Sequence, residues 1–328
     1  MSKVLVVGGG GYVGGYLVDE LIQSGHEVGV FDLLLYEDRF LKPVKFFLGN
    51  ISDTSDLLAI SRDYEVVIWL AALVGDPLCA LDENLTKEVN TEAPLRFRRE
   101  FDGEFVFMST CSVYGAQDGL LDEDSPTNPL SIYAQTKLRS EEGLLSIGKP
   151  NLILRLGTLF GISDAHARLR ADLVLNVLVI RAVYSKQLTV FGGEQFRPLL
   201  HVRDVGRAIV SALNAGIHGT FNLHCENISI VGLAERISHV VPDVEIVRTE
   251  TSFQDSRNYS VSSNLFKEMS DFSPKYSIEH GIVELHEALL SGRFPNILNS
   301  NYINVDKMRG TYLPRKNPTL SEYWRPLK

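Results

Sequence analysis

Residues 4–15 read VLVVGGGGYVGG, and this stretch decides the fold. The run from Val4 to Val7 is short, aliphatic and rich in β-branched residues, which is typical of a strand buried in a parallel sheet. Glycines end this run, and from Tyr12 to Ile22 the apolar residues recur at helical spacing. A strand, a glycine turn and a helix in this order predict the first unit of a nucleotide-binding sheet.

Three glycines of the turn, Gly8, Gly11 and Gly14, are three residues apart. In such a turn the backbone N–H groups can approach a pyrophosphate, and the helix N-terminus adds partial positive charge. Gly14 would let the helix pack closely against the strand. Many strand–helix turns are rich in glycine without binding a nucleotide, so the motif depends on the segments around it.

The second predicted strand, residues 27–31, ends in Asp32. A carboxylate at this strand tip can accept hydrogen bonds from the adenosine ribose hydroxyls, and it would repel a 2′-phosphate. No arginine follows directly, because residues 33–35 are all leucine. The sequence therefore predicts NAD rather than NADP as the cofactor.

The composition excludes several classes of function. The 328 residues are 45% hydrophobic and 22% charged, as in a globular protein with one large or two modest domains. A net charge of −9 argues against nucleic acid as a partner. The three cysteines are isolated and the histidines lack metal-ligand spacing, so we expect no disulfide, no metal and a reducing compartment. Without a signal peptide or an apolar run of membrane-spanning length, we expect a cytoplasmic protein with no membrane partner.

Strand and helix patterns alternate along the first half of the chain. The predicted strands are 4–7, 27–31, 44–48, 66–70, 105–108 and 152–155, and the predicted helices are 12–24, 55–62, 84–99 and 132–145. Further helices are expected at 173–184, 202–213, 229–240 and 279–291, with strands at 188–191 and 220–223. This pattern predicts an α/β fold: a Rossmann doubly wound parallel sheet with a smaller C-terminal substrate-binding lobe.

The expected domains are derived from this pattern. Residues 1–161 form the NAD-binding Rossmann domain, to which a segment at about 200–225 returns. Residues 162–294 form most of the substrate lobe. Residues 295–328 are a C-terminal extension with little apolar periodicity, which we expect to wrap around a subunit or to be partly disordered.

Candidate catalytic residues lie after the fifth predicted strand. Tyr133 and Lys137 are four residues apart and therefore share one face of a helix. A nearby ammonium favours phenolate and lowers a tyrosine pKa, so Tyr133 could act as a base. Thr110, at the tip of the strand, could bind the substrate oxygen that exchanges the proton. The alternatives are a surface tyrosine and lysine, and a threonine that bonds the local backbone.

These residues resemble the extended short-chain dehydrogenases, the NAD-dependent epimerase/dehydratase family that acts on nucleotide sugars. The similarity rests on residues 8–14, Asp32, residues 70–72, Asn90, residues 109–115 and 133–137, and it continues through residues 154–161, 197–205 and 255–262. The resemblance implies that Tyr133 is the base, Lys137 its partner and Thr110 the hydroxyl that shares the substrate proton.

The resemblance also implies two sets of binding residues. The residues expected to bind NAD are Gly8, Gly11, Tyr12, Val13, Gly14, Asp32, Asn50, Ile51, Leu70, Ala71, Ala72, Asn90, Tyr133 and Lys137. Those expected to contact a nucleotide-diphosphate sugar are Val74, Cys111, Ser112, Thr158, Arg168, Arg170, Asn176, Arg197 and Arg257. Arg197 matches the family arginine that holds the nucleotide diphosphate, although a surface ion pair is the alternative for each arginine. Related proteins dimerise through the helices at 84–99 and 132–145, so a homodimer is expected.

The family oxidises a sugar hydroxyl, often at C4, and its members differ in the fate of the resulting ketone. Sugar 4,6-dehydratases carry an Asp-Glu pair after the catalytic threonine, where this chain has Cys111 and Ser112, so dehydration is disfavoured. An epimerase, a 4-dehydrogenase and a 4-ketoreductase remain. Residues 72–79 and 168–176 resemble a subgroup that oxidises GDP-heptoses at C4. A non-catalytic NAD sensor would commonly lack the tyrosine or the lysine, and both are present here.

Overall fold

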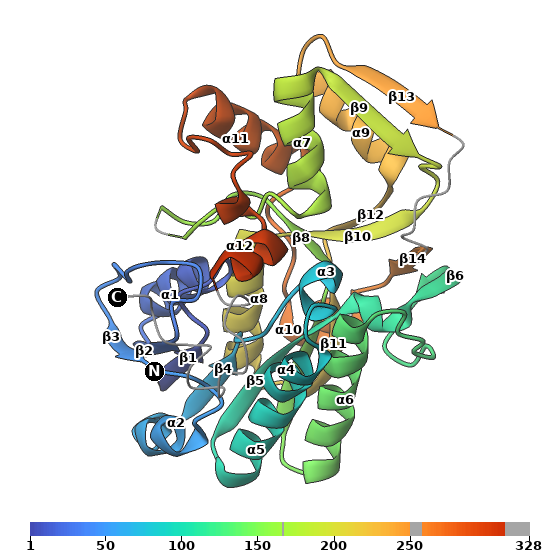
Figure 1. Ribbon diagram of the computed structural model, residues 1–328. Helices are drawn as coiled ribbons and strands as arrows, with labels where there is room; N and C mark the ends of the chain where they lie inside the picture. The colour runs from blue at the N-terminus through green and yellow to red at the C-terminus, as the bar shows by residue number, and fades with distance from the viewer. Residues whose placement is uncertain (166, 250–257, 312–328) are drawn as a thin grey trace.

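The computed structural model describes residues 1–165, 167–249 and 258–311, and its centre is a sheet of seven parallel strands (Figure 1). The strand order is β11-β7-β5-β4-β1-β2-β3. The strands are β1 (Lys3–Val7), β2 (Glu27–Asp32), β3 (Lys45–Leu48), β4 (Val66–Trp69), β5 (Glu104–Thr110), β7 (Asn151–Leu156) and β11 (Gly219–Leu223). The order reverses between β1 and β4, which is the position where doubly wound sheets bind nucleotides. The predicted α/β Rossmann fold is confirmed.

Helices cover both faces of this sheet, and the alternation of side chains along each strand explains why. Val4 and Val6 point into one apolar layer with α1 (Gly14–Gln23) and α8 (Val202–Ala215). Leu5 and Val7 point into the other layer. The helices of that layer are α2 (Thr54–Ser61), α5 (Ala93–Glu100) and α6 (Ile132–Ile147). Burial on both faces requires the continuous apolar run seen in the sequence.

Segments from beyond residue 200 complete the Rossmann sheet. Strand β11 pairs with β7 in parallel, and α8 packs against α1. Phe266 on α10 (Asn264–Ser270) is buried in the same layer.

The second lobe has its own apolar core, formed by α7 (Val174–Ser185), α9 (Ile230–Val240), α11 (Ile278–Leu290) and the pair β9 (Gln187–Phe191) and β13 (Glu245–Thr249). Two small sheets lie toward the Rossmann half in Figure 1: β12 (Glu226–Ser229), β10 (Phe196–His201) and β8 (Thr158–Phe160), and the pair β14 (Asn258–Val261) and β6 (Ala116–Leu121). The sequence did not predict β6, β8, β10, β12, β13 or β14. These strands have only three to six residues each, too few to show a clear period.

The predicted helix 84–99 is built from three consecutive segments: α4 (Glu83–Lys87), a π-helical turn (Glu88–Glu92) and α5. Shorter elements are α3 (Asp76–Cys79) and the 3₁₀ turns Cys111–Tyr114 and Ser300–Tyr302. None of the helices in the described ranges has both the length and the apolar character needed to cross a membrane.

The described part of the C-terminal extension contacts its own chain, and residues 312–328 lie outside the described residues. Its helix α12 (Asn304–Thr311) lies between the two lobes in Figure 1 and packs against α3 of the same chain. The sequence predicted contact with a subunit or partial disorder, because few apolar residues in this stretch recur at helical spacing. Two apolar contacts of α12, made by the partly buried Val305 and the buried Met308, explain its position.

Candidate active site

A cavity of about 980 Å³ opens at the carboxyl ends of β1, β2, β4 and β5. The second lobe contributes residues of β8, α7, β9 and β10 to its lining, and the C-terminal extension contributes Ile303, Asn304 and Val305. The position is the one that a doubly wound sheet offers its ligands. The volume is near the upper end of the ~300–1,000 Å³ usual for small-molecule pockets, as a large ligand requires.

The glycine turn after β1 forms part of the wall of this cavity. Gly8 has φ +87°, and a Cβ there would lie 2.5 Å from the backbone nitrogen of Ala71, so only glycine fits. Gly8 and Gly11 line the cavity with Tyr12 and Val13, whereas Gly14 lies outside it. Glycines leave the backbone of this turn open to the cavity, and the turn leads directly into α1. A dinucleotide pyrophosphate would therefore meet backbone N–H groups at a helix N-terminus.

Asp32 lies at the tip of β2 and lines the cavity. Its Oδ2 accepts a hydrogen bond from the Gly10 N–H at 2.9 Å, and its Oδ1 accepts one from the Leu34 N–H at 2.6 Å. Burial raises the pKa of the Asp32 carboxyl, while these backbone bonds act in the opposite direction. Asn50 and Ile51 line the same end of the cavity. The geometry suits an adenosine whose ribose hydroxyls meet a fixed carboxylate.

The loop after β4 lines the cavity with Leu70, Ala71, Ala72 and Val74. Asn90, in the π-helical turn, is buried and supports this loop from behind. Its Oδ1 accepts a bond from the Leu73 N–H at 2.8 Å, and its Nδ2 donates to the Leu73 carbonyl at 2.9 Å. Asn90 does not line the cavity, and its side chain instead supports the loop that does.

The three candidate catalytic residues all line the cavity. Thr110 ends β5, and Tyr133 stands in the first turn of α6, where the Ser131 side chain caps the helix. Burial raises the pKa of Tyr133 above its ordinary value, with Cys79 and Asp76 acting in the same direction. Arg170 and a side-chain hydrogen bond with Thr110 lower it. The two hydroxyl groups are therefore paired on one wall.

Lys137 is buried beside the end of β5. Its Nζ donates to the Met108 carbonyl at 2.9 Å and lies 4.7 Å from the centre of the Phe107 ring. Burial is the largest influence on the pKa of Tyr133 and raises it, so the lowering of this pKa by Lys137 stays a prediction. Burial lowers the pKa of Lys137 to about 8. Lys137 still lines the cavity and fixes the end of β5 through Met108.

Six of the predicted substrate residues line the cavity: Val74, Ser112, Thr158, Arg168, Arg170 and Arg197. Arg197 is on β10 and only 6% exposed, and its Nη1 donates to the Phe196 carbonyl at 2.8 Å. The Ser112 hydroxyl lies 3.3 Å from the phenol oxygen of Tyr259.

Two predicted substrate residues are placed elsewhere. Cys111 is fully buried outside the cavity, and its Sγ donates to the Arg155 carbonyl at 3.0 Å. Asn176 is also fully buried, and its side chain bonds the Gly161 backbone N–H and carbonyl at 3.1 and 3.2 Å. Alternation along β5 and its 3₁₀ turn directs Cys111 inward, while Asn176 faces a turn of its own chain. Arg257 lies outside the described residues.

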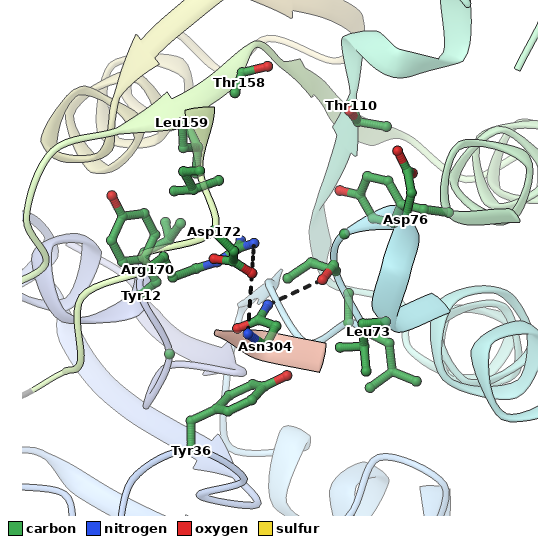
Figure 2. Close-up of a pocket in the computed structure, with 18 of the residues that line it drawn as sticks. Tyr12, Tyr36, Leu73, Asp76, Thr110, Thr158, Leu159, Arg170, Asp172 and Asn304 are labelled. Carbon is green, nitrogen blue, oxygen red and sulfur yellow. Dashed lines mark hydrogen bonds and ion pairs between the residues drawn. The ribbon is translucent and has the colours of Figure 1, made fainter. Parts of the chain in front are cut away.

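Arg168 and Arg170 line the cavity. Figure 2 shows Arg170 near Asp172 and Asn304, two residues that the sequence did not single out. Arg170 forms a two-point ion pair with Asp172, with Nε–Oδ1 and Nη2–Oδ2 distances of 3.0 and 3.1 Å. The Asn304 backbone N–H donates to Asp172 at 3.3 Å. The RxRxD spacing of residues 168–172 could have indicated the ion pair. No local signal pointed to Asn304, which reaches the cavity from the C-terminal extension.

Among the residues that the structure describes, no cluster of His, Cys, Asp or Glu could hold a metal ion.

Comparisons with known proteins agree with this geometry. A model of the NAD dependent epimerase/dehydratase family matches residues 4–223. The chain is similar to an uncharacterized UDP-glucose epimerase, YtcB, of Bacillus subtilis, with 28% identity over 318 residues that cover 85% of this chain and 95% of the relative. It is similar to a UDP-glucose 4-epimerase of Lactobacillus helveticus, with 31% identity over 240 residues, 64% of this chain and 72% of the relative.

Solved structures share the fold. Pal from Bacillus thuringiensis superimposes with a TM-score of 0.77 at 26% identity, covering 88% of this chain and 99% of Pal. The UDP-glucose 4-epimerase of Thermotoga maritima superimposes with a TM-score of 0.78 at 24% identity, covering 89% and 99% of the two chains.

The match over residues 4–223 contains the glycine turn, Asp32, Thr110, Tyr133 and Lys137. The predicted family and the predicted NAD cofactor are confirmed, and the cradle at Gly8 fits that cofactor. The chain therefore belongs to the NAD dependent epimerase/dehydratase family and is an NAD-dependent enzyme of the short-chain dehydrogenase type.

Proposed function

We propose that the protein oxidises the C4 hydroxyl of a nucleotide-diphosphate sugar and then reduces the ketone on its other face, as a 4-epimerase. One observation carries the proposal: Thr110 and Tyr133 meet on the wall of a cavity that also holds a dinucleotide cradle and the buried Arg197. The similar UDP-glucose 4-epimerases favour this outcome over a single redox step.

Tyr133 takes the proton of the sugar hydroxyl in this proposal, and NAD, when bound, supplies the hydride acceptor. Thr110 donates a hydrogen bond to the same oxygen and holds it over Tyr133. Burial raises the pKa of Tyr133, so proton transfer needs positive charge nearby, and Arg170 already acts in that direction. On the return step Tyr133 gives the proton back, so the enzyme ends as it began.

Arg197 would hold the nucleotide diphosphate. A guanidinium presents a planar fork of N–H donors that matches phosphate oxygens. Thr189, Phe191 and Gln195 line the same region of the cavity. The sugar would then extend toward Val74 and Thr158.

Elimination of water remains disfavoured for this site. Cys111 does not reach the cavity, and burial raises the pKa of its thiol. Ser112 does reach the cavity but offers only a hydroxyl. The acid–base pair that a 4,6-dehydratase needs after Thr110 is therefore absent at these two positions.

The test is turnover of UDP-, GDP- and dTDP-hexoses, followed by sugar analysis of the product. We expect an interconversion of C4 epimers without net NADH, and a drop in kcat of about 10²–10⁴-fold in Tyr133→Phe. Tyr64→Phe, which removes a phenol hydroxyl from a residue outside the cavity lining, serves as the matched control. Net NADH accumulation would indicate a 4-dehydrogenase, and undiminished activity of Tyr133→Phe would refute the assignment of the base.

We also propose a homodimer formed by the outer faces of α4, α5 and α6. The family resemblance supports this arrangement, and so does the exposed Leu145 near the end of α6.

A further inference from the structure

We propose that helix α12 is a strap that closes the NAD cavity, and that Arg168, held by Asn304 of this strap, binds a phosphate oxygen of the bound dinucleotide. The proposal rests on the NAD cofactor and not on which sugar is turned over. It assigns Arg168 to the cofactor, whereas the sequence had predicted a substrate contact.

The first support is the apolar contact of α12. Val305 and Met308 belong to one cluster with residues from both ends of the cofactor cavity, and Met308 is only 2% exposed. Leu33, Leu35 and Ile51 lie at the end marked by Asp32, and Leu73, Leu78 and Tyr133 at the end marked by Thr110. The strap therefore bridges the cavity from its adenosine end to its catalytic end.

The second support is polar and centres on Asn304 (Figure 2). Its Nδ2 donates to the Val74 carbonyl at 3.2 Å, on the loop after β4. Its backbone N–H donates to Asp172, and its Oδ1 accepts from Nη2 of Arg168. One residue thus joins the extension to both lobes.

The third support is the state of Arg168. Its guanidinium lies 4.1 Å from the centre of the Tyr36 ring, a cation–π contact that fixes the plane of the fork. Its Nε and Nη1 are buried and find no hydrogen-bond partner within the described parts of the chain. Buried N–H donors without a partner destabilise the folded protein. We therefore expect the Arg168 side chain to bind a hydrogen-bond acceptor of a ligand.

The neighbours of Arg168 indicate which ligand that is. Its backbone N–H donates to Glu37 at 2.7 Å, and Glu37 and Tyr36 belong to the segment that follows Asp32. Arg197, by contrast, lies on β10 with the candidate nucleotide-sugar residues. Arg168 therefore lies on the cofactor side of the cavity, where we infer that it meets a phosphate of the dinucleotide, and Arg197 would meet the diphosphate of the substrate.

Retention of the cofactor is the expected consequence. A strap tied to both lobes must detach before NAD leaves, so the enzyme would keep one NAD through many turnovers. Such retention suits a cycle that returns its hydride, because no exchange of the cofactor is needed.

The experiment measures loss of labelled NAD from the full-length protein by rapid gel filtration, without any sugar nucleotide. Arg168→Gln and Asn304→Ala should each release NAD about tenfold faster or more, since each removes charge-assisted or paired hydrogen bonds. Arg309→Ala, an exposed residue of the same helix, is the control and should release NAD at the wild-type rate. Circular dichroism and thermal unfolding show that each variant is folded.

Binding of UDP to the same variants separates the two diphosphates. Weaker UDP binding with unchanged NAD release in Arg168→Gln would overturn the assignment to the cofactor. Tighter NAD binding in Asn304→Ala would show that α12 competes with NAD, and would overturn the strap. Both results are independent of sugar turnover, so failure of the proposed epimerase activity leaves this test intact.

Discussion

At the scale of single residues, the site shows how burial opposes ionisation. Tyr133 needs a lower pKa to act as a base, yet the same enclosure that excludes water raises it. Burial shifts the pKa of Lys137 in the opposite direction: it lowers this pKa and so favours the neutral amine. Its bond to Met108 fixes the strand end that carries Thr110, so we assign Lys137 a positioning role in the protein without ligand.

Lys137→Met should raise the free energy of unfolding of the cofactor-free protein at pH 7, by about 1–3 kcal/mol. In the folded protein burial lowers the pKa of Lys137 from 10.5 to about 8, so below pH 8 the native state carries an unfavourable buried ammonium. As the pH rises from 8 to 10.5, the native lysine loses its proton first, and the difference between variant and wild type should shrink. Urea unfolding across this pH range measures it.

A surface lysine gives the control for this pH dependence. Lys87→Met alters a partly exposed i,i+4 ion pair with Glu83 on α4, and we expect it to change the free energy of unfolding by less than about 0.5 kcal/mol. A constant difference between Lys137→Met and wild type from pH 7 to pH 10.5 would contradict the buried-ammonium account.

At the scale of elements, two glycines of the β1–α1 turn have different roles. A Cβ on Gly14 would lie 2.2 Å from the Gly9 carbonyl oxygen, so this glycine allows the helix to approach the turn. A Cβ on Gly11 would lie 3.5 Å from the Gly8 carbonyl oxygen, an ordinary contact, but would project from a residue that lines the cavity. The two positions look alike in the sequence and differ in the structure.

Gly14→Ala should therefore lower the free energy of unfolding by about 1–3 kcal/mol, because the backbone has to shift. Gly11→Ala should leave stability within about 0.5 kcal/mol of wild type, and weaken NAD binding instead. Chemical unfolding of the cofactor-free protein and titration with NAD provide the two measurements. An equal loss of stability in both variants would show that Gly11 and Gly14 do not have separate roles.

At the scale of the whole molecule, the cavity exists because two lobes are held together across it. The Tyr12 phenol donates to the Gly161 carbonyl at 2.5 Å, and Lys42 contacts Asp164 at 2.7 Å with both side chains less than a tenth exposed. The helix α12 adds a third connection. The positions of Arg168 and Arg197 relative to the glycine turn depend on these connections.

The proposed homodimer gives a prediction at this scale. Light scattering at micromolar concentration should report twice the mass of one chain. Leu145, 60% exposed on α6, lies on the proposed interface, so Leu145→Glu should shift the mass toward the monomer. Leu290→Glu, at a 69% exposed leucine ending α11, should not. A monomeric wild type would contradict the proposal.

The sequence by itself determined the parts of this protein that depend on local periodicity and local geometry. The apolar run of β1, the glycine turn and the tip at Asp32 are short-range patterns, and they predicted a Rossmann sheet with NAD at its switch point. The helix start at Ser131 likewise placed Tyr133 in a first turn, after the strand that ends at Thr110.

Only the tertiary structure decided which side chains reach the cavity. Cys111 and Asn176 turn away from it, whereas Asn304 reaches it from more than 130 residues beyond Asp172. The reason is physical: period and spacing describe neighbours along the chain, while burial and the pairing of charges depend on contacts between segments far apart. The pKa of Tyr133 is such a property, since the burial that raises it comes from segments far apart in the sequence.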